Sequence, residues 1–138
     1  MLTTQCLCTK LRRSARAVTR VYDDALKGVG LTTAQFSLLR HLSRLEQPSI
    51  SDLADAMGLD RSTLGRNLRP LESEGLVRLD EGADLRNRIV VLTPAGLERI
   101  MRGREAWDAA QQDVAAHLGD DKRRQLEALL DELATLDS

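Results

Sequence analysis

The stretch that most limits the possible folds of this chain is ISDLADAMGLDRSTL, residues 50–64. The small Ala54 can lie where two helices cross, and Gly58 allows a tight turn between them. Asp60 or Ser62 can then accept backbone hydrogen bonds at the start of the following helix. Two short helices joined by such a turn predict a helix-turn-helix.

The helix that follows, over residues 61–74, has two unlike sides. At 100° per residue, Leu64, Leu68 and Leu71 fall together on one side, and arginines and serines lie on the other. The leucines are therefore expected to pack and the arginines to stay exposed. Pro70 lies on the polar side and predicts either a bend near the helix end or early fraying.

A cationic helix of this kind fits the major groove of B-DNA, where arginine bonds to guanine or to phosphates. Gly65 leaves room for close approach to the duplex. The candidate DNA-binding residues of this helix are Arg61, Ser62, Thr63, Gly65, Arg66 and Arg69. The alternative is that Arg66 and Arg69 are only solvated, which is the usual fate of exposed arginines.

Apolar periodicity predicts further helices on both sides of this motif. The first covers residues 6–27, and a second is capped by Thr32 or Thr33 and ends before Pro48. Residues 49–50 can form only a strand stub, and Ser51 is expected to cap the first helix of the helix-turn-helix.

After the cationic helix the pattern changes to short strands. Residues 76–79 and 88–92 are rich in apolar residues and flank the polar sequence DEGADLRN, which predicts a hairpin. Thr93 and Pro94 then mark the start of a helix over about 94–118, and Gly119 separates it from a last leucine-rich helix.

Together these elements predict a mainly α fold, a winged helix-turn-helix with a small two-stranded β-wing. The leucine stripes of the terminal helices exceed what so small a body can cover, so these helices are expected to be N- and C-terminal dimerisation helices. The expected division is a dimerisation helix over 1–30, the DNA-binding domain over 31–93 and further dimerisation helices over 94–138.

Charge is unevenly distributed along the 138 residues. Residues 1–104 hold 17 Lys and Arg against 12 Asp and Glu, whereas residues 105–138 hold 3 against 9. The basic excess therefore belongs to the part that contains the helix-turn-helix. We find no apolar run long enough for a membrane helix and no signal peptide, so a cytoplasmic protein is expected.

The sequence DLRNRIVVLTPAG, residues 84–96, resembles the wing motif of the MarR family of bacterial regulators. The matching residues are Asp84, Arg86, Leu92, Thr93 and Gly96. The resemblance implies that Arg86 enters the minor groove and that Asp84 holds this arginine in place. It also implies a two-fold homodimer that binds a palindromic site, with half-sites about one helical turn apart.

Three other charged residues of the wing bear on this resemblance. Arg88 can reach a phosphate or pair with an acid on the hairpin. Asp80 and Glu81 repel phosphate, and the wing is about one residue shorter than in many relatives. We therefore expect a DNA-binding wing whose depth of insertion is limited by these acids.

Both cysteines lie near the start of the first helix, in the sequence QCLCTKL. Residues 7–11, LCTKL, resemble the reactive-cysteine sequence of the organic-hydroperoxide-sensing branch, which makes Cys8 the candidate sensor and Cys6 a resolving thiol or a partner across the dimer. Thr33 and Phe36 stand where that branch has assisting tyrosines. The alternative is two reduced cysteines that only fill space in the interface.

The function predicted is sequence-specific binding of double-stranded DNA by a homodimeric transcriptional regulator, a repressor released by a small-molecule effector or by cysteine oxidation. The alternative is a winged-helix module that binds protein and not DNA. No enzyme activity and no cofactor are expected, because there is no phosphate-binding glycine loop and no nucleophile with supporting groups. His41 and His117 have no metal-ligand spacing with the cysteines, so no metal site is expected.

Overall fold

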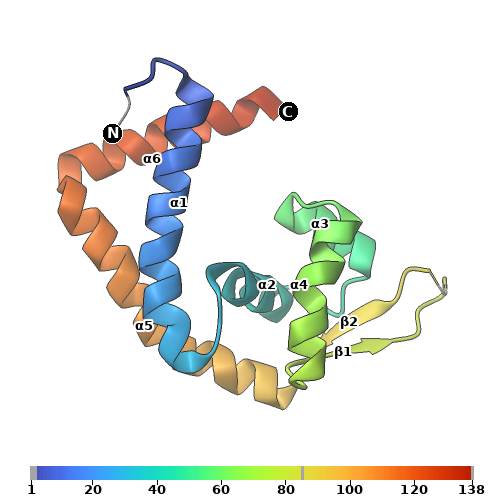
Figure 1. The fold of residues 1–138 in the computed structure, drawn as a ribbon. Coiled ribbons are helices and arrows are strands. Elements are labelled where there is room, and N and C mark those ends of the chain that lie inside the picture. Colours follow the sequence, from blue (N-terminus) through green and yellow to red (C-terminus); the bar gives the residue numbers. More distant parts are fainter. Residues whose placement is uncertain (1–2, 85, 138) are drawn as a thin grey trace.

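The computed structural model describes residues 3–84 and 86–137, so Met1, Leu2, Leu85 and Ser138 lie outside the described part. Its elements are α1 (Leu7–Leu26), η1 (Lys27–Val29), α2 (Thr33–Arg44), α3 (Ile50–Met57), α4 (Arg61–Ser73), β1 (Val77–Asp80), β2 (Ile89–Leu92), α5 (Pro94–Leu118), α6 (Asp120–Ala134) and η2 (Thr135–Asp137). The prediction of a mainly α fold with a two-stranded wing is confirmed. Figure 1 shows α3, α4 and the hairpin on one side of the molecule, and α5 running from beneath them to the side where it meets α1 and α6.

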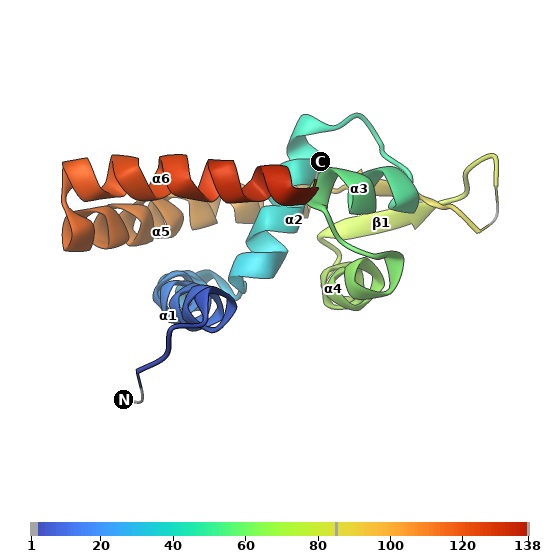
Figure 2. The same ribbon diagram turned by 90° about the horizontal axis from the view of Figure 1, so that it is seen from above.

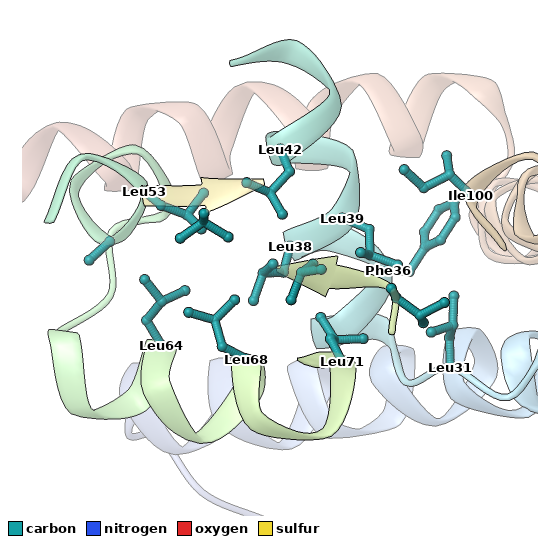
Figure 3. Packing of buried hydrophobic residues seen from close by; sticks show 14 of the residues in the cluster. Leu31, Phe36, Leu38, Leu39, Leu42, Leu53, Leu64, Leu68, Leu71 and Ile100 are labelled. Carbon is teal, nitrogen blue, oxygen red and sulfur yellow. The ribbon is translucent and has the colours of Figure 1, made fainter. Parts of the chain in front are cut away.

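The core forms between the helix-turn-helix, the hairpin and the start of α5. Leu64, Leu68 and Leu71 are buried, and in Figure 3 they point from one side of α4 towards α2. Phe36 of α2 and Ile100 of α5 extend the same buried cluster. Packing therefore buries the leucine side of α4 and leaves its opposite side exposed.

The predicted start of α3 is wrong by two residues. Ser49, and not Ser51, is the N-cap, since its Oγ accepts a hydrogen bond of 3.1 Å from the backbone N–H of Asp52. The predicted strand stub is reduced to one bridge, between Ser49 and Ile89, and Ile50 already begins the helix. The backbone N–H of Ile50 donates to the Arg88 carbonyl at 2.9 Å, so a contact with the wing sets this boundary.

The other caps follow the sequence closely. Thr32 caps α2 in a reciprocal arrangement with Gln35, and Thr93 caps α5 with Pro94 in the first turn. Asp60 caps α4, which selects it over Ser62. Gly58 closes α3 with a φ of 65°, a conformation that glycine adopts at low cost.

The wing is an antiparallel pair in which Val77 lies opposite Leu92 and Asp80 opposite Ile89. It projects from the end of α4, and Figure 2 shows it extending away from the layer of α5 and α6. The backbone N–H of Val90 donates to the Pro48 carbonyl at 2.8 Å, which ties β2 to the segment before α3. The hairpin is therefore held at a fixed place beside the helix-turn-helix.

The terminal helices leave large apolar side chains uncovered in the single chain. The exposed large apolar residues of these helices are Leu7, Leu11, Val18, Val21, Leu97, Met101, Leu126, Leu129, Leu130 and Leu133. No helix in residues 3–84 and 86–137 has the length and apolar character needed to cross a membrane. One buried cluster runs from Leu26 to Ile100 and so joins all three predicted segments, and the division at residues 30 and 93 stays a prediction.

Candidate nucleic-acid interface

The cationic helix α4 begins at a strong cap. The Asp60 carboxylate accepts hydrogen bonds from the backbone N–H of Thr63 at 2.7 Å and from the Ser62 hydroxyl at 2.8 Å. These bonds favour the charged form and lower the pKa of Asp60 to about 2. The first turn of α4 is therefore well ordered where a recognition helix needs its most precise geometry.

The outer side of α4 carries the predicted DNA-binding residues. Arg61, Ser62, Arg66 and Arg69 are exposed, whereas Thr63 and Gly65 are partly covered. A guanidinium nitrogen of Arg66 donates to the Thr63 hydroxyl at 3.3 Å, which draws the two side chains together. A side chain added at Gly65 meets nothing within 4 Å, so this part of the surface is open.

Pro70 lies inside α4 and on its exposed side. The helix continues to Ser73, and the backbone N–H of Glu74 donates to the Pro70 carbonyl at 3.1 Å. The helix therefore does not fray at Pro70 but continues past it. Gly75, with a φ of 74°, then turns the chain into β1.

The predicted wing residues lie together at the tip of the hairpin, next to the start of α4. Asp84 accepts a hydrogen bond of 3.0 Å from the backbone N–H of Arg86, so it shapes the turn around this arginine through the main chain. The Arg61 guanidinium donates to the Arg86 carbonyl at 2.5 Å. The structure thus brings the recognition helix and the wing tip into direct contact.

Arg88 and Asp80 are engaged within the hairpin, whereas Glu81 is exposed. The Arg88 guanidinium donates to the Leu79 carbonyl on the opposite strand at 2.7 Å. Asp80 pairs with Arg78 through bonds of 2.8 and 3.1 Å, which lowers the pKa of Asp80 and raises the pKa of Arg78. Asp80 therefore repels phosphate less than the sequence alone implied.

Two residues that organise this surface were not singled out from the sequence. The side-chain oxygen of Asn87 accepts from the backbone N–H of Ser51 at 3.0 Å and ties the wing to α3. Arg78 provides the cation that pairs with Asp80. The spacing in the sequence could have predicted the contact between Arg78 and Asp80, because residues two apart in a strand lie on the same face.

Known proteins are similar to this chain over most of its length. A model of the MarR family matches residues 29–86. A putative transcriptional regulatory protein for the hcr operon of Thauera aromatica is 32% identical over 130 residues, which cover 93% of this chain and 78% of that protein. The chain belongs to the MarR family. The resemblance seen in the wing motif is thereby confirmed, and the chain is a MarR-type transcriptional regulator.

Solved structures of MarR family regulators have the same winged fold. The Mycobacterium tuberculosis regulator MosR, in complex with DNA, has a TM-score of 0.82 and 37% identity, with 96% of this chain and 98% of that chain covered. An Escherichia coli MarR mutant complexed with operator DNA has a TM-score of 0.83 and 23% identity, with 92% of each chain covered. The second likeness supports the fold alone.

The MarR wing motif owes part of its pattern to packing. The Thr93 hydroxyl caps α5 by accepting from the backbone N–H of Gly96 at 3.1 Å, and it donates to the Gly75 carbonyl at 2.6 Å. A Cβ atom on Gly96 would lie 2.2 Å from the Leu76 carbonyl oxygen, so no larger residue fits there. These two residues join the end of α4 to the start of α5.

Both cysteines are free and exposed at the start of α1. Hydrogen bonds from the Thr9 side chain and backbone lower the pKa of Cys6, which is the N-cap residue of this helix. Thiolates are stabilised by such donors at a helix N-terminus. In the part of the chain that the structure describes, no three His, Cys, Asp or Glu residues are placed to hold a metal ion.

Proposed function

We propose that this MarR family regulator binds double-stranded DNA as a homodimer, with α4 in the major groove and Arg86 in the adjacent minor groove. The observation that carries the proposal is the separation of the two sides of α4. Its leucines are buried in the core, while Arg66 and Arg69 stay exposed on the side where Gly65 is open. Arginine on such a helix reads guanine edges or holds phosphates.

The position of the wing supports a contact that spans two grooves. The bond from Arg61 to the Arg86 carbonyl fixes the wing tip beside the start of α4. An arginine at a hairpin tip is attracted by the negative potential of a narrow minor groove. Arg86 would therefore enter the minor groove next to the major-groove site of α4.

Homodimerisation through α1, α5 and α6 is supported by apolar exposure and by charge. α1 carries five basic residues before its first acid, and residues 125–137 carry acids and no base. The basic residues of α1 are Lys10, Arg12, Arg13, Arg16 and Arg20, and the acids of the C-terminal stretch are Glu127, Asp131, Glu132 and Asp137. Exposed leucines and valines accompany both sets, so α6 of one copy suits α1 of the other.

A two-fold dimer presents two copies of α4, and this arrangement favours a palindromic operator with half-sites about one helical turn apart. Binding at such a site within a promoter obstructs transcription, so we assign the role of a repressor. Release then requires a change that alters the distance between the two recognition helices.

Cysteine oxidation is the first route of release that we propose. A Cys6 or Cys8 thiolate attacks a hydroperoxide and breaks its O–O bond; the sulfur becomes a sulfenic acid, and the alkoxide takes up a proton and leaves as an alcohol. The other thiol then attacks the sulfenic sulfur, an S–S bond forms and water leaves. The lowered pKa of Cys6 favours it as the attacking thiol, whereas the resemblance to peroxide sensors implied Cys8.

A small-molecule effector is the second route. A cavity of about 610 Å³ opens between α1, α5 and α6, with Val18, Val21, Val114 and Leu118 among its apolar lining residues and His117 among its polar ones. A ligand bound there would contact helices that carry the exposed apolar surface of the proposed dimer. It would thereby change how the two copies pack.

The test is selection of bound DNA from a random pool, followed by affinity measurements on the selected site. Symmetric sites are expected, and Arg66→Ala and Arg86→Ala should each weaken binding by about 1–3 kcal/mol. Arg102→Ala, which removes an exposed arginine of α5, is the matched control and should bind normally. Equal affinity of the wild-type protein for selected and random DNA would contradict the proposal.

The route of release is separated by repeating the measurement with peroxide and with reductant. Peroxide should weaken operator binding by the wild-type protein, and reductant should restore it. Cys6→Ser and Cys8→Ser should each keep binding in peroxide, because neither variant can form the disulfide. Unchanged binding of the wild-type protein in peroxide would leave only the effector route.

A further inference from the structure

The C-terminal end of α4 is fixed to the first turn of α5. Thr93 donates from its hydroxyl to the Gly75 carbonyl at 2.6 Å, and its backbone N–H donates to the Leu76 carbonyl at 3.2 Å. Gly96 packs directly against the Leu76 backbone, where no Cβ atom fits. The recognition helix and the start of α5 therefore move as one unit.

α5 packs along α1, and within the described residues the Arg99 side chain adds a polar link between η1, which follows α1, and the end of α4. Its Nη1 atom donates to the Val29 carbonyl in η1 at 3.2 Å and lies 3.6 Å from Oε1 of Glu74, at the C-terminal end of α4. The Arg99 side chain is 20% exposed, whereas the Glu74 side chain is 46% exposed, so the pair lies at the edge of the surface. The ion pairs of the wing and of α6 lie within single elements, whereas this one joins two helices.

The end of α1 is held to the winged domain at a second place. The Asp23 carboxylate accepts from the backbone N–H and the hydroxyl of Thr33 at 2.7 and 2.6 Å, at the start of α2. This contact fixes α1 to α2 but does not reach α4. Arg99 is thus the side chain that contacts both the α1 end and the recognition-helix end.

We propose that Arg99 is a positioning residue that sets the orientation of the recognition helix relative to α1. The effect of Arg99 on DNA binding rests on the proposed function, in which α1 forms part of the dimer surface. With Arg99 in place, the two copies of α4 are held at the separation that one spacing of half-sites requires. Without it, α4 samples more orientations and tolerates other spacings.

The test measures the distance between α1 and α4 within one protomer of the full chain. Spin labels are attached at Ala15→Cys and Ser73→Cys, two exposed positions, in a chain with Cys6→Ser and Cys8→Ser, and labelled chain is diluted with unlabelled chain. A narrow distance distribution is expected for Arg99, a broader one for Arg99→Met and an intermediate one for Arg99→Lys. The lysine keeps the charge, but its side chain is shorter than that of arginine, whose Nη1 atom makes both contacts.

Arg102→Met is the matched control, because it removes the same charge from an exposed position on α5 and should keep the narrow distribution. On DNA, Arg99→Met should lose about 2- to 30-fold in affinity for the selected operator. It should lose less on an operator with one added central base pair, so its discrimination between the two spacings should fall.

An unchanged distance distribution in Arg99→Met overturns the proposal. This holds even if the variant unfolds at a lower urea concentration than the wild-type protein. A broader distribution supports it. If the wild-type protein does not prefer the selected operator, the proposed function fails, but the distance measurement still decides the role of Arg99. The two failures are therefore distinguishable.

Discussion

Replacing Gly96 by alanine is expected to destabilise the protein, although alanine normally favours a helix. Gly96 is buried in the first turn of α5. The added Cβ would lie 2.2 Å from the Leu76 carbonyl oxygen and 2.6 Å from Cδ1 of Leu92. The leucine side chain can turn aside, but the carbonyl belongs to the backbone that leads into β1, so the chain itself must shift.

The size of the effect follows from two opposing terms. Alanine gains about 1 kcal/mol over glycine within a helix. Overpacking of a well-filled core costs about 1–3 kcal/mol, and a clash with backbone belongs at the upper end of this range. The expected net loss in the free energy of unfolding is therefore about 2 kcal/mol.

Urea unfolding at one fixed protein concentration measures this loss, since the stability of a dimer depends on concentration. Gly65→Ala is the control: its Cβ meets nothing within 4 Å, so it should gain up to about 1 kcal/mol. Equal stability of the two variants would refute the argument that the Leu76 carbonyl leaves no room at position 96.

Three further outcomes are expected. Gly65→Ala, although more stable, should bind the selected operator more weakly in a gel-shift assay, because its methyl group occupies the open face of α4. Asp60→Asn should remove one source of acid lability. The folded state lowers the pKa of Asp60 from 3.8 to about 2, so the wild-type carboxylate stabilises the fold above pH 4 and loses this contribution as the pH falls towards 2. In urea titrations the stability difference between the wild-type protein and Asp60→Asn should therefore shrink between pH 4 and pH 2. Leu129→Lys should weaken dimerisation more than Leu129→Glu in light scattering, since the α1 surface proposed to face this exposed residue is basic; equal effects would contradict that pairing.

Much of the fold could be predicted from local sequence because local chemistry decides it. The leucine spacing of α4 fixed which side is buried, and Thr32 and Thr93 act as caps for the helices that follow them. Gly58 ends α3 where the sequence predicted a turn. In these places the nearest neighbours in the chain satisfy the backbone groups.

The features that could not be predicted depend on contacts between distant residues. α3 starts at Ile50, with Ser49 as its N-cap, where the Ile50 N–H bonds to the Arg88 carbonyl in the wing. The bond between Arg61 and Arg86 joins residues 25 positions apart. Sequence alone predicted both arginines as DNA contacts but gave no means to see that they touch.

The wing illustrates how such contacts change the meaning of a charge pattern. Counted from the sequence, its acids offset its arginines, and the hairpin has no excess of positive charge to offer DNA. In the structure Asp80 is paired with Arg78, Asp84 is bonded to the backbone N–H of Arg86, and Arg88 is turned back onto a carbonyl. The Arg86 guanidinium has no bonding partner within the described residues, and it lies at the exposed tip. The contribution of the wing to DNA binding is therefore expected to depend on the placement of this one side chain, and not on the net charge of the hairpin.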